Sequence, residues 1–196
     1  MTTVKKITRR LIARKLSKGF AAGLIGGLAA SAVMNQFQKT LSKLFGEREK
    51  PHGAQSLQAG SPQHGAGAEL REMGLDNPDD NAAERTANLV ATKLFDRRLS
   101  EDEKHVAGTV AHYAFGASTG AIYGVSAEVV TEVTAGAGLP FGAAVWLMAD
   151  EVVVPALGLS KLPTDYPLSK HAYALASHLV YGLTTDLVRK AVRRAL

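Results

Sequence analysis

The stretch GFAAGLIGGLAASAVMNQFQ, residues 19–38, runs for 20 residues without a charged side chain. About 20 predominantly apolar residues are enough for an α-helix to cross the hydrocarbon core of a membrane. Gly19, Gly23 and Gly27 recur every four residues in this stretch and therefore lie near one helical face. Because helices in lipid associate by close packing, small residues at this spacing are expected at a helix–helix contact. The stretch predicts a membrane-spanning helix that packs through its glycines.

Three further stretches carry almost no charge. Residues 106–127 contain no charged side chain. Residues 133–160 are interrupted only by the adjacent Asp150 and Glu151, and residues 167–188 contain one basic and one acidic side chain. Each stretch is long enough to cross a membrane as a helix. The sequence therefore predicts an all-α fold, a four-helix transmembrane bundle.

The predicted organisation along the chain has four parts. A basic amphipathic segment covers residues 1–18, and the first membrane helix covers residues 19–42. A polar extracytoplasmic loop covers residues 43–104. Membrane helices two to four and a basic C-terminal tail fill residues 105–196.

The second apolar stretch also carries a glycine face, formed by Gly116, Gly120 and Gly124. Glycine in the interior of a soluble helix is unfavourable by about 1 kcal/mol relative to alanine. Its repetition at a four-residue spacing is instead typical of close helix packing in lipid. We expect these glycines to be packing positions rather than the lining of a ligand groove.

The composition narrows the range of functions. The chain has no cysteine, which excludes disulfides, thiolate catalysis and iron–sulfur clusters. A hydrolase is disfavoured, because we recognise no nucleophile setting of the α/β-hydrolase kind. Only 6% of the residues are aromatic while 19 are glycine, an unusual composition for the core of a soluble protein. We expect a non-enzymatic protein without a cofactor, and a soluble helical protein is the less favoured alternative.

The polar region between the first two apolar stretches predicts one short helix. Residues 47–68 are rich in Gly, Pro, Gln, Ser and His, which is typical of a flexible loop. The apolar spacing in residues 78–94 predicts an amphipathic helix with Asn77 as its N-cap. Ser100 and Glu103 have the spacing of a capping box, so we expect the second long helix to begin there.

Both ends of the chain are basic. Residues 1–18 contain seven Lys and Arg residues, no acidic residue precedes Glu47, and residues 189–194 contain four more basic residues. Short basic flanks remain on the cytoplasmic side of a membrane, and an even number of spans puts both termini on that side. We therefore expect a multi-pass protein of the bacterial inner membrane with both termini in the cytoplasm.

The N-terminal segment has an apolar and a basic side. Val4, Ile7 and Leu11 fall near one face of a helix whose other side is basic. This pattern is typical of a segment on an anionic membrane surface, and equally of a nucleic-acid-binding tail. The adjacent apolar helix favours the membrane, so lipid is the expected partner and nucleic acid is not. The run Ala30-Ser-Ala32 leaves a cleaved signal peptide as an alternative.

Four ionisable side chains lie deep inside the predicted membrane helices: His112 in the second, Asp150 and Glu151 in the third, and His178 in the fourth. Such groups are energetically expensive at membrane depth and are a functional hypothesis by default. A helix rises 1.5 Å per residue, which places His112, Glu151 and His178 roughly 10–14 Å below the outer boundary. We therefore expect an intramembrane polar cluster.

Further side chains complete the predicted cluster. Tyr113, Tyr181 and His171 are candidate supporting residues. Pro155 has no N–H to donate to the carbonyl of Glu151, so we expect a helix kink beside the acidic pair. Broken helices at membrane depth are tolerated where the freed groups line a cavity or meet other protein groups.

The predicted cluster has three interpretations. It could be a hydrogen-bonded cluster that locks the helices together, or a relay for protons or ions. It could also bind a metal or haem, since two histidines and a carboxylate suit iron or zinc, although no Glu-x-x-His motif is present and the metal is unknown. The leading hypothesis is a non-enzymatic membrane bundle that assembles with itself or with a larger complex and handles protons. The alternative is a metal- or haem-binding membrane subunit.

Several short runs resemble one known family. These runs are His112-Tyr-Ala-Phe-Gly116, Tyr123-Gly124, Phe141-Gly-Ala-Ala-Val-Trp146, the segment around Pro155, and Ser177-His-Leu-Val-Tyr-Gly182. As a set they resemble the YagU-like family of bacterial inner-membrane proteins, over roughly residues 19–38 and 105–195. The resemblance implies a multi-span inner-membrane protein of unestablished activity with a link to acid stress. It implies no catalytic residues.

Overall fold

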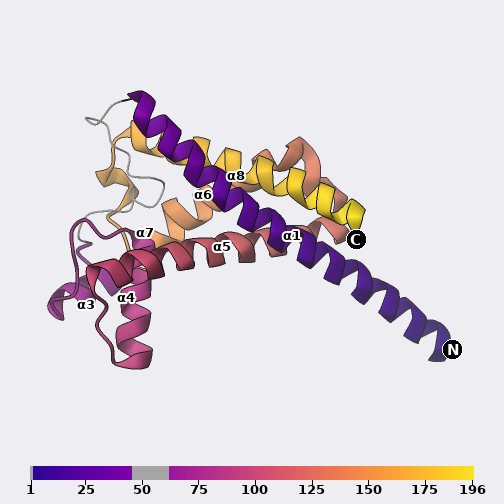
Figure 1. The fold of residues 1–196 in the computed structure, drawn as a ribbon, viewed down its shortest axis with the longest axis horizontal. Coiled ribbons are helices and arrows are strands. Elements are labelled where there is room, and N and C mark those ends of the chain that lie inside the picture. The colour runs from indigo at the N-terminus through magenta and orange to yellow at the C-terminus, as the bar shows by residue number, and fades with distance from the viewer. Residues whose placement is uncertain (1, 46–61) are drawn as a thin grey trace.

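The structure, a computed structural model, describes residues 2–45 and 62–196, and all regular structure in those ranges is helical. The elements are α1 (Thr2–Phe45), α3 (Gly65–Glu72), α4 (Ala82–Phe95), α5 (Glu101–Val129), η2 (Thr131–Gly138), α6 (Leu139–Trp146), η3 (Leu147–Val153), α7 (Val154–Ala156), η4 (Pro163–Asp165) and α8 (Leu168–Ala195). Long helices lie side by side, and the short α3 and α4 lie at one end of them (Figure 1). The all-α prediction is confirmed.

α1 is one continuous helix of 44 residues. The predicted boundary between a basic segment, residues 1–18, and a first span, residues 19–42, is therefore not a structural break. Residues 2–18 contain no proline or glycine, so nothing in them interrupts a helix. The side chains of residues 5–15 are exposed, and this end of α1 projects past the other helices (Figure 1).

α1 packs against α5 through facing glycines. A Cβ atom added to Gly120 would lie 2.5 Å from the carbonyl oxygen of Gly23, and one added to Gly23 would collide with the carbonyl oxygen of Gly120. The other facing pairs are Gly19 with Gly124 and Gly27 with Gly116. Only glycine permits so close an approach of two backbones. The order of the pairs shows that the two helices run antiparallel.

α8 also packs against α1, where Gly26 lies against the backbone of Thr185, and α8 contacts α6 as well. A Cβ atom added to Gly182 would lie 2.6 Å from the backbone nitrogen of Gly142, so α6 and α8 also meet through glycines. Gly138, four residues before Gly142, faces the same Gly182. This contact was not predicted from the sequence. α5 and α6 each pack on their neighbours but scarcely on one another, which leaves a gap between them.

The two ends of the chain lie at one end of the bundle (Figure 1). Lys18 Nζ donates a hydrogen bond to the carbonyl of Leu196, and Arg193 Nε lies 2.7 Å from Glu128 Oε1. These contacts join the base of the α1 projection, the end of α5 and the end of α8. The opposite end carries α3 and α4.

The third apolar stretch, residues 133–160, is not the single helix that its composition predicts. It starts in the 3₁₀ segment η2, where Gly136 and Gly138 take φ values of 70° and 82°. It continues through α6 into the π-helical η3, in which the N–H of Val154 donates to the carbonyl of Ala149, five residues earlier. Pro155 follows in the three-residue α7. The predicted kink is therefore a π turn before the proline and a helix end directly after it.

The polar region contains two helices where one was predicted. The predicted helix is α4, which begins at Ala82 with an N-terminal capping box formed by Asn81, rather than at Asn77. α3 begins at Gly65, inside the segment predicted to be a flexible loop; residues 47–61 of that segment lie outside the described residues. The capping box of Ser100 and Glu103 at the start of α5 is confirmed.

Two helical stretches among the described residues are long and apolar enough to cross a membrane. They are Lys5–Lys43 and Thr131–Ala156, judged by length and composition. Only 11% of the apolar part of Thr131–Ala156 is buried within the protein. The rest of the protein therefore covers little of this apolar helix, whereas an apolar helix in the core of a soluble protein is mostly buried.

Candidate functional site

A pocket of about 640 Å³ occupies the gap between α5 and the segment α6–η3–α7. We call it the α5–α6 groove. It is lined by Ser31 and Met34 of α1, by Ala82, Ala83 and Thr86 of α4, by Ala111, His112, Phe115, Gly116, Thr119 and Ile122 of α5, by Phe141, Ala144, Val145, Met148, Ala149, Asp150, Val153 and Val154 of the third segment, and by His178 and Tyr181 of α8. Its size is that of a pocket for a small organic ligand, and most of its lining is apolar.

Three of the predicted cluster residues, from three different elements, line this groove. They are His112 of α5, Asp150 of η3 and His178 of α8. His178 Nδ1 donates to the carbonyl of Ala174 at 2.9 Å and lies 3.7 Å from Asp150 Oδ2, an electrostatic contact rather than a hydrogen bond. Nε2 of His112 is buried and has no hydrogen-bond partner among the described residues. An imidazole nitrogen and a carboxylate are therefore close to the groove volume.

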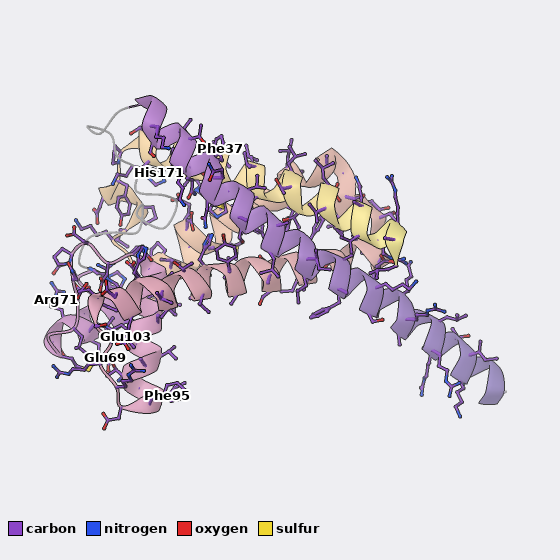
Figure 2. All side chains as sticks on the ribbon, in the orientation of Figure 1. Phe37, Glu69, Arg71, Phe95, Glu103 and His171 are labelled. Atoms are coloured by element: carbon purple, nitrogen blue, oxygen red, sulfur yellow. The ribbon has the colours of Figure 1, made fainter. Side chains whose placement is uncertain are left out.

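The fourth predicted cluster residue, Glu151, points elsewhere. Its Oε1 lies 2.6 Å from His171 Nδ1, and His171 Nε2 donates to the carbonyl of Pro163 at 3.0 Å. His171 lies at the end of the bundle where α1 ends (Figure 2). Glu151 and His171 do not line the α5–α6 groove, but both line a small second pocket together with Asp150. They therefore lie beside the groove cluster, and Asp150 lines both pockets.

The two candidate supporting tyrosines have different roles. The hydroxyl of Tyr181 donates to the carbonyl of Gly116 at 2.6 Å and lies 2.8 Å from Thr119 Oγ1, which joins α8 to α5 at the floor of the groove. The hydroxyl of Tyr113 accepts a hydrogen bond from Asn35 Nδ2 at 3.3 Å. Tyr113 therefore contacts α1 and does not line the groove.

A second buried charge lies near the basic end of the bundle. Asp186 of α8 is fully buried and accepts a hydrogen bond from the hydroxyl of Tyr123 at 3.0 Å. Arg189 Nη2 lies 2.9 Å from Asp186 Oδ1, and Lys190 Nζ lies 2.6 Å from Asp186 Oδ2. Asp186 was not predicted to be a site residue, because in the sequence it is only one of two charges that interrupt the fourth apolar stretch. The pattern that could have identified it is the presence of basic residues three and four positions later, the usual spacing of helical ion pairs.

The end with α3 and α4 is held by two buried ion pairs, Lys104 with Asp80 and Arg85 with Asp76, and by the more exposed pair of Lys104 with Glu101. Lys104 Nζ lies 3.0 Å from Asp80 Oδ2 and 2.8 Å from Glu101 Oε1. Burial raises the pKa of Asp80 in spite of the lysine. Burial alone would lower the pKa of Lys104, but its hydrogen bonds to the two acids outweigh burial and raise that pKa. Arg85 is fully buried, with Nε 2.8 Å from Asp76 Oδ1 and Nη1 donating to the carbonyl of Leu159 at 3.2 Å.

One hydrolase-like run lies in α5. Gly116-Ala-Ser-Thr-Gly120 matches the letters of the G-x-S-x-G motif, which places its serine on a sharp turn between a strand and a helix. Here the run is inside a continuous helix, and Ser118 Oγ donates to the carbonyl of Ala114 at 2.8 Å. The letters match because the packing glycines Gly116 and Gly120 are four residues apart. A serine inside a continuous helix does not have the geometry of a hydrolase nucleophile.

The alternative of a metal site gains no support from the arrangement of ligands. Among the described residues, no group of three or more His, Asp or Glu side chains could hold a metal ion together. His112, Asp150 and His178 line one groove without forming such a group. The geometry favours a polar cluster beside an apolar volume.

Comparison with known proteins places the chain in a family. Residues 77–187, more than half of the chain, match a family described as protein of unknown function, DUF1440. The chain belongs to this family. The DUF1440 match begins just before α4 and ends in α8, so it includes the groove cluster but not α1. No curated protein and no solved structure matches the chain. This match confirms the prediction that the chain belongs to an uncharacterised family.

Proposed function

We propose that this DUF1440 protein is a four-span protein of the bacterial inner membrane that handles protons at the α5–α6 groove. α1, α5, the segment α6–η3–α7 and α8 would be the four spans. The observation that carries the proton-handling proposal is the meeting of Asp150, His112 and His178, from three elements, at one apolar groove. Ionisable groups in such a setting are typical of ion and proton pathways in membranes.

The outer faces of the bundle support the membrane part of the proposal. Large apolar side chains are exposed on each of the four spans: Phe20, Ile25 and Val33 on α1, Val106, Val110 and Val129 on α5, Leu139, Leu147 and Val152 on the third segment, and Leu183 and Leu187 on α8. A soluble monomer rarely exposes contiguous apolar surface on this scale. Lipid chains would cover these faces without any change in the packing of the helices.

The distribution of charge supports an orientation. The exposed basic residues of α1 and the basic end of α8 lie at one end of the bundle, and the polar α3 and α4 lie at the other (Figure 1). Basic flanks remain in the cytoplasm, so both termini would be cytoplasmic and α3 and α4 extracytoplasmic. The basic projection of α1 would then contact anionic lipid headgroups. A second copy or another membrane protein is the expected protein partner, and nucleic acid is not.

Reporter fusions test the four spans. Fusions after Asp96 and after Thr164 should read outside the cytoplasm, because both positions lie at the end with α3 and α4. Fusions after Thr134 and after Leu196 should read cytoplasmic. Opposite readings at Thr134 and Leu196 would contradict the pair of spans formed by α6–η3–α7 and α8. Recovery of the whole protein in the soluble fraction would contradict all four spans.

Proton handling is tested in liposomes. Purified protein is reconstituted into liposomes that contain a pH-sensitive dye. A potassium diffusion potential set with valinomycin then drives protons into the liposomes. Wild type and Glu151→Gln should acidify the lumen, while Asp150→Asn should not, because only Asp150 lines the groove. An equal rate of acidification in protein-free liposomes would contradict the proposal.

Two further experiments test the remaining hypotheses. An absorption spectrum and metal analysis of the same preparation test the metal or haem alternative. Acid survival of cells with these variants tests the YagU-like link to acid stress.

A further inference from the structure

α4 has a different direction from the long helices. It runs across α5 instead of along it, and its tip stands away from the bundle (Figure 1). The first turn of α4 packs on α5, where a Cβ atom added to Gly108 would lie 3.1 Å from the backbone nitrogen of Glu84. His105 Nδ1 lies 3.1 Å from Glu84 Oε1 at the same crossing. Since α5 would cross the membrane, α4 would lie along the membrane surface.

The crossing of α4 and α5 lies at a definite depth. Gly108 is 20 residues before Glu128, which pairs with Arg193 at the basic end of the bundle. A helix rises 1.5 Å per residue, so about 30 Å of α5 separates the two positions, which is about the thickness of the hydrocarbon core. Residues 109–127, between them, contain no Asp, Glu, Lys or Arg. α4 therefore crosses α5 where the hydrocarbon core would end.

One side of α4 is covered by the polar segment that precedes it. Arg85 Nη2 donates to the carbonyl of Asn77 at 3.1 Å, and Asn88 Nδ2 donates to the carbonyl of Leu75 at 3.0 Å. Both side chains are buried beneath this segment. The polar segment therefore lies between this side of α4 and the extracytoplasmic space.

The other side of α4 carries a stripe of mainly apolar residues. We call Ala83, Thr86, Val90 and Leu94 the α4 stripe, because their spacing of three and four residues places them on one helical face. Ala83 and Thr86 line the α5–α6 groove, so the stripe faces the interior of the bundle rather than the polar segment. Exposure rises toward the tip, where Val90 is 43% and Leu94 is 71% exposed. The stripe begins at the groove and ends in the open.

We propose that α4 is an interfacial helix whose stripe lies against the acyl chains of the extracytoplasmic leaflet. The proposal rests on the proposed function, since it takes α5 as a membrane span. A helix of this kind buries its apolar face about 5–10 Å into the boundary between headgroups and acyl chains. Arg97 and Arg98 are exposed directly after the helix, and their long side chains would reach the phosphates of the headgroups.

Depth and direction favour lipid over a protein partner for the α4 stripe. A protein in the extracytoplasmic space would approach from the polar side of α4, whereas Val90 and Leu94 face the opposite way. Val110, two residues inside the crossing at Gly108, is also an exposed apolar side chain. The apolar surface of α5 therefore starts at the level that the stripe faces, and one lipid layer would cover both.

Tryptophan fluorescence in vesicles tests the proposal. Trp146→Phe removes the single tryptophan, and Leu94→Trp then places one at the end of the stripe. The purified full-length protein is reconstituted into phosphatidylcholine vesicles with or without bromine on the acyl chains. Bromine should reduce the fluorescence by about half or more, and iodide in the water should reduce it little, because the side chain lies among acyl chains.

Two further positions complete the experiment. Asp79→Trp, at an exposed position of the polar segment, is the control and should be quenched by iodide and not by bromine. Val90→Trp, one turn before Leu94 in the stripe, should be quenched by bromine and gives a second reading if Leu94→Trp perturbs the helix end.

Two results would overturn the proposal. Quenching of Leu94→Trp and Val90→Trp by iodide alone would place the stripe in water, and quenching by neither would assign the stripe to a protein contact. Ile25→Trp, at an exposed position of α1, separates this inference from the proposed function. Bromine quenching of Ile25→Trp alone would leave the membrane bundle standing without an interfacial α4. Absence of bromine quenching at all three positions would remove both proposals.

Discussion

At the scale of single residues, the neighbours Asp150 and Glu151 have different surroundings. Asp150 lines the α5–α6 groove with His178 nearby, whereas Glu151 contacts His171 at the end of the bundle. Both acids belong to the π-helical η3, in which the hydrogen bonds reach five residues back. π turns inside α-helices occur frequently at functional sites. Each of the two acids therefore has a different nearest histidine, His178 for Asp150 and His171 for Glu151.

The buried Asp186 should be a strong determinant of stability. Asp186→Asn should lower the free energy of unfolding by about 3 kcal/mol, because it removes the counter-charge of the buried Arg189. Tyr123→Phe removes one hydrogen bond to the carboxylate of Asp186 and should lower the free energy of unfolding by about 1 kcal/mol. Unfolding in detergent measures both. Equal stabilities of the two variants would show that the charge of Asp186 is not needed for folding.

Glu101 gives a prediction for pH. Its hydrogen bond from Lys104 holds the pKa of Glu101 below its ordinary value of 4.5. A carboxyl with a lowered pKa in the folded state stabilises the fold above its unfolded pKa, and this stabilisation is lost as the pH falls through the folded pKa. Glu101→Gln should therefore be less stable than wild type at about pH 7, by about 0.5 kcal/mol for so exposed a pair.

The same comparison at low pH is the decisive one. At about pH 3 the difference between Glu101→Gln and wild type should have shrunk toward zero. Glu72→Gln, at an exposed position of α3, is the control and should follow wild type at both values. A difference that stays constant over this range would mean that Glu101 acts by packing rather than by charge.

At the scale of elements, glycines determine which helices can approach each other. α1 meets α5 along three pairs of glycines, and α6 meets α8 through Gly142 and Gly182. α5 and α6 have no such pairing of glycines, and the stacked rings of Tyr123 and Phe141 hold their backbones further apart. Since the groove is the space between them, the positions of the glycines also determine where the cavity lies.

Enlarging one glycine of the α1–α5 contact should separate these helices. Gly23→Leu and Gly120→Leu should each lower the free energy of unfolding by about 3 kcal/mol, because a side chain would collide with the facing backbone. Helix propensity alone predicts the opposite sign, by about 1 kcal/mol per residue. Ala114→Leu, on an exposed face of α5, is the matched control and should leave stability nearly unchanged. Stability equal to or above wild type in the glycine variants would exclude a packed contact.

At the scale of the whole molecule, the polar segment closes one end of the bundle. The N–H groups of Ala66 and Gly67 donate to the carbonyls of Leu157 and Gly158 at 3.0 and 2.8 Å. α4 packs on α5 and contributes three residues to the groove lining. The tip of α4, in contrast, stands away from the bundle, with Phe95 72% exposed (Figure 2). The segment is thus part of the site, and its tip is free for a lipid or protein contact.

Arg85 should hold this closing segment in place. Arg85→Met leaves the buried Asp76 without its ion pair and should destabilise the protein by about 3 kcal/mol. Since Arg85 also bonds to the carbonyl of Leu159, the variant should expose α3 and α4 to limited proteolysis. Arg98→Met, at an exposed position, should show neither effect. Unchanged proteolysis of Arg85→Met would mean that α4 is held by its packing on α5 alone.

The local elements follow from the sequence because their causes are local. Apolar runs, capping residues and the absence of prolines specify α1, α5 and α8, and the four-residue spacing of glycines marks the faces of α1 and α5. α3 could not be predicted from the sequence, because it is short and depends on backbone hydrogen bonds to the loop after α7. Nor could the π turn be predicted, since the response of a helix to a proline depends on the space around it.

What the sequence determined by itself is the all-helical class, the basic ends and the set of ionisable residues inside apolar stretches. What only the tertiary structure decided is which of these residues meet. Asp150 rather than Glu151 joins His178, and His171 rather than His112 pairs with Glu151. The physical reason is that a contact between helices depends on their rotation and register, and these depend on distant glycines such as Gly142 and Gly182. The groove likewise exists because the backbones of α5 and α6 do not approach closely and the two helices meet through the stacked rings of Tyr123 and Phe141, a relation that neither helix carries in its own sequence.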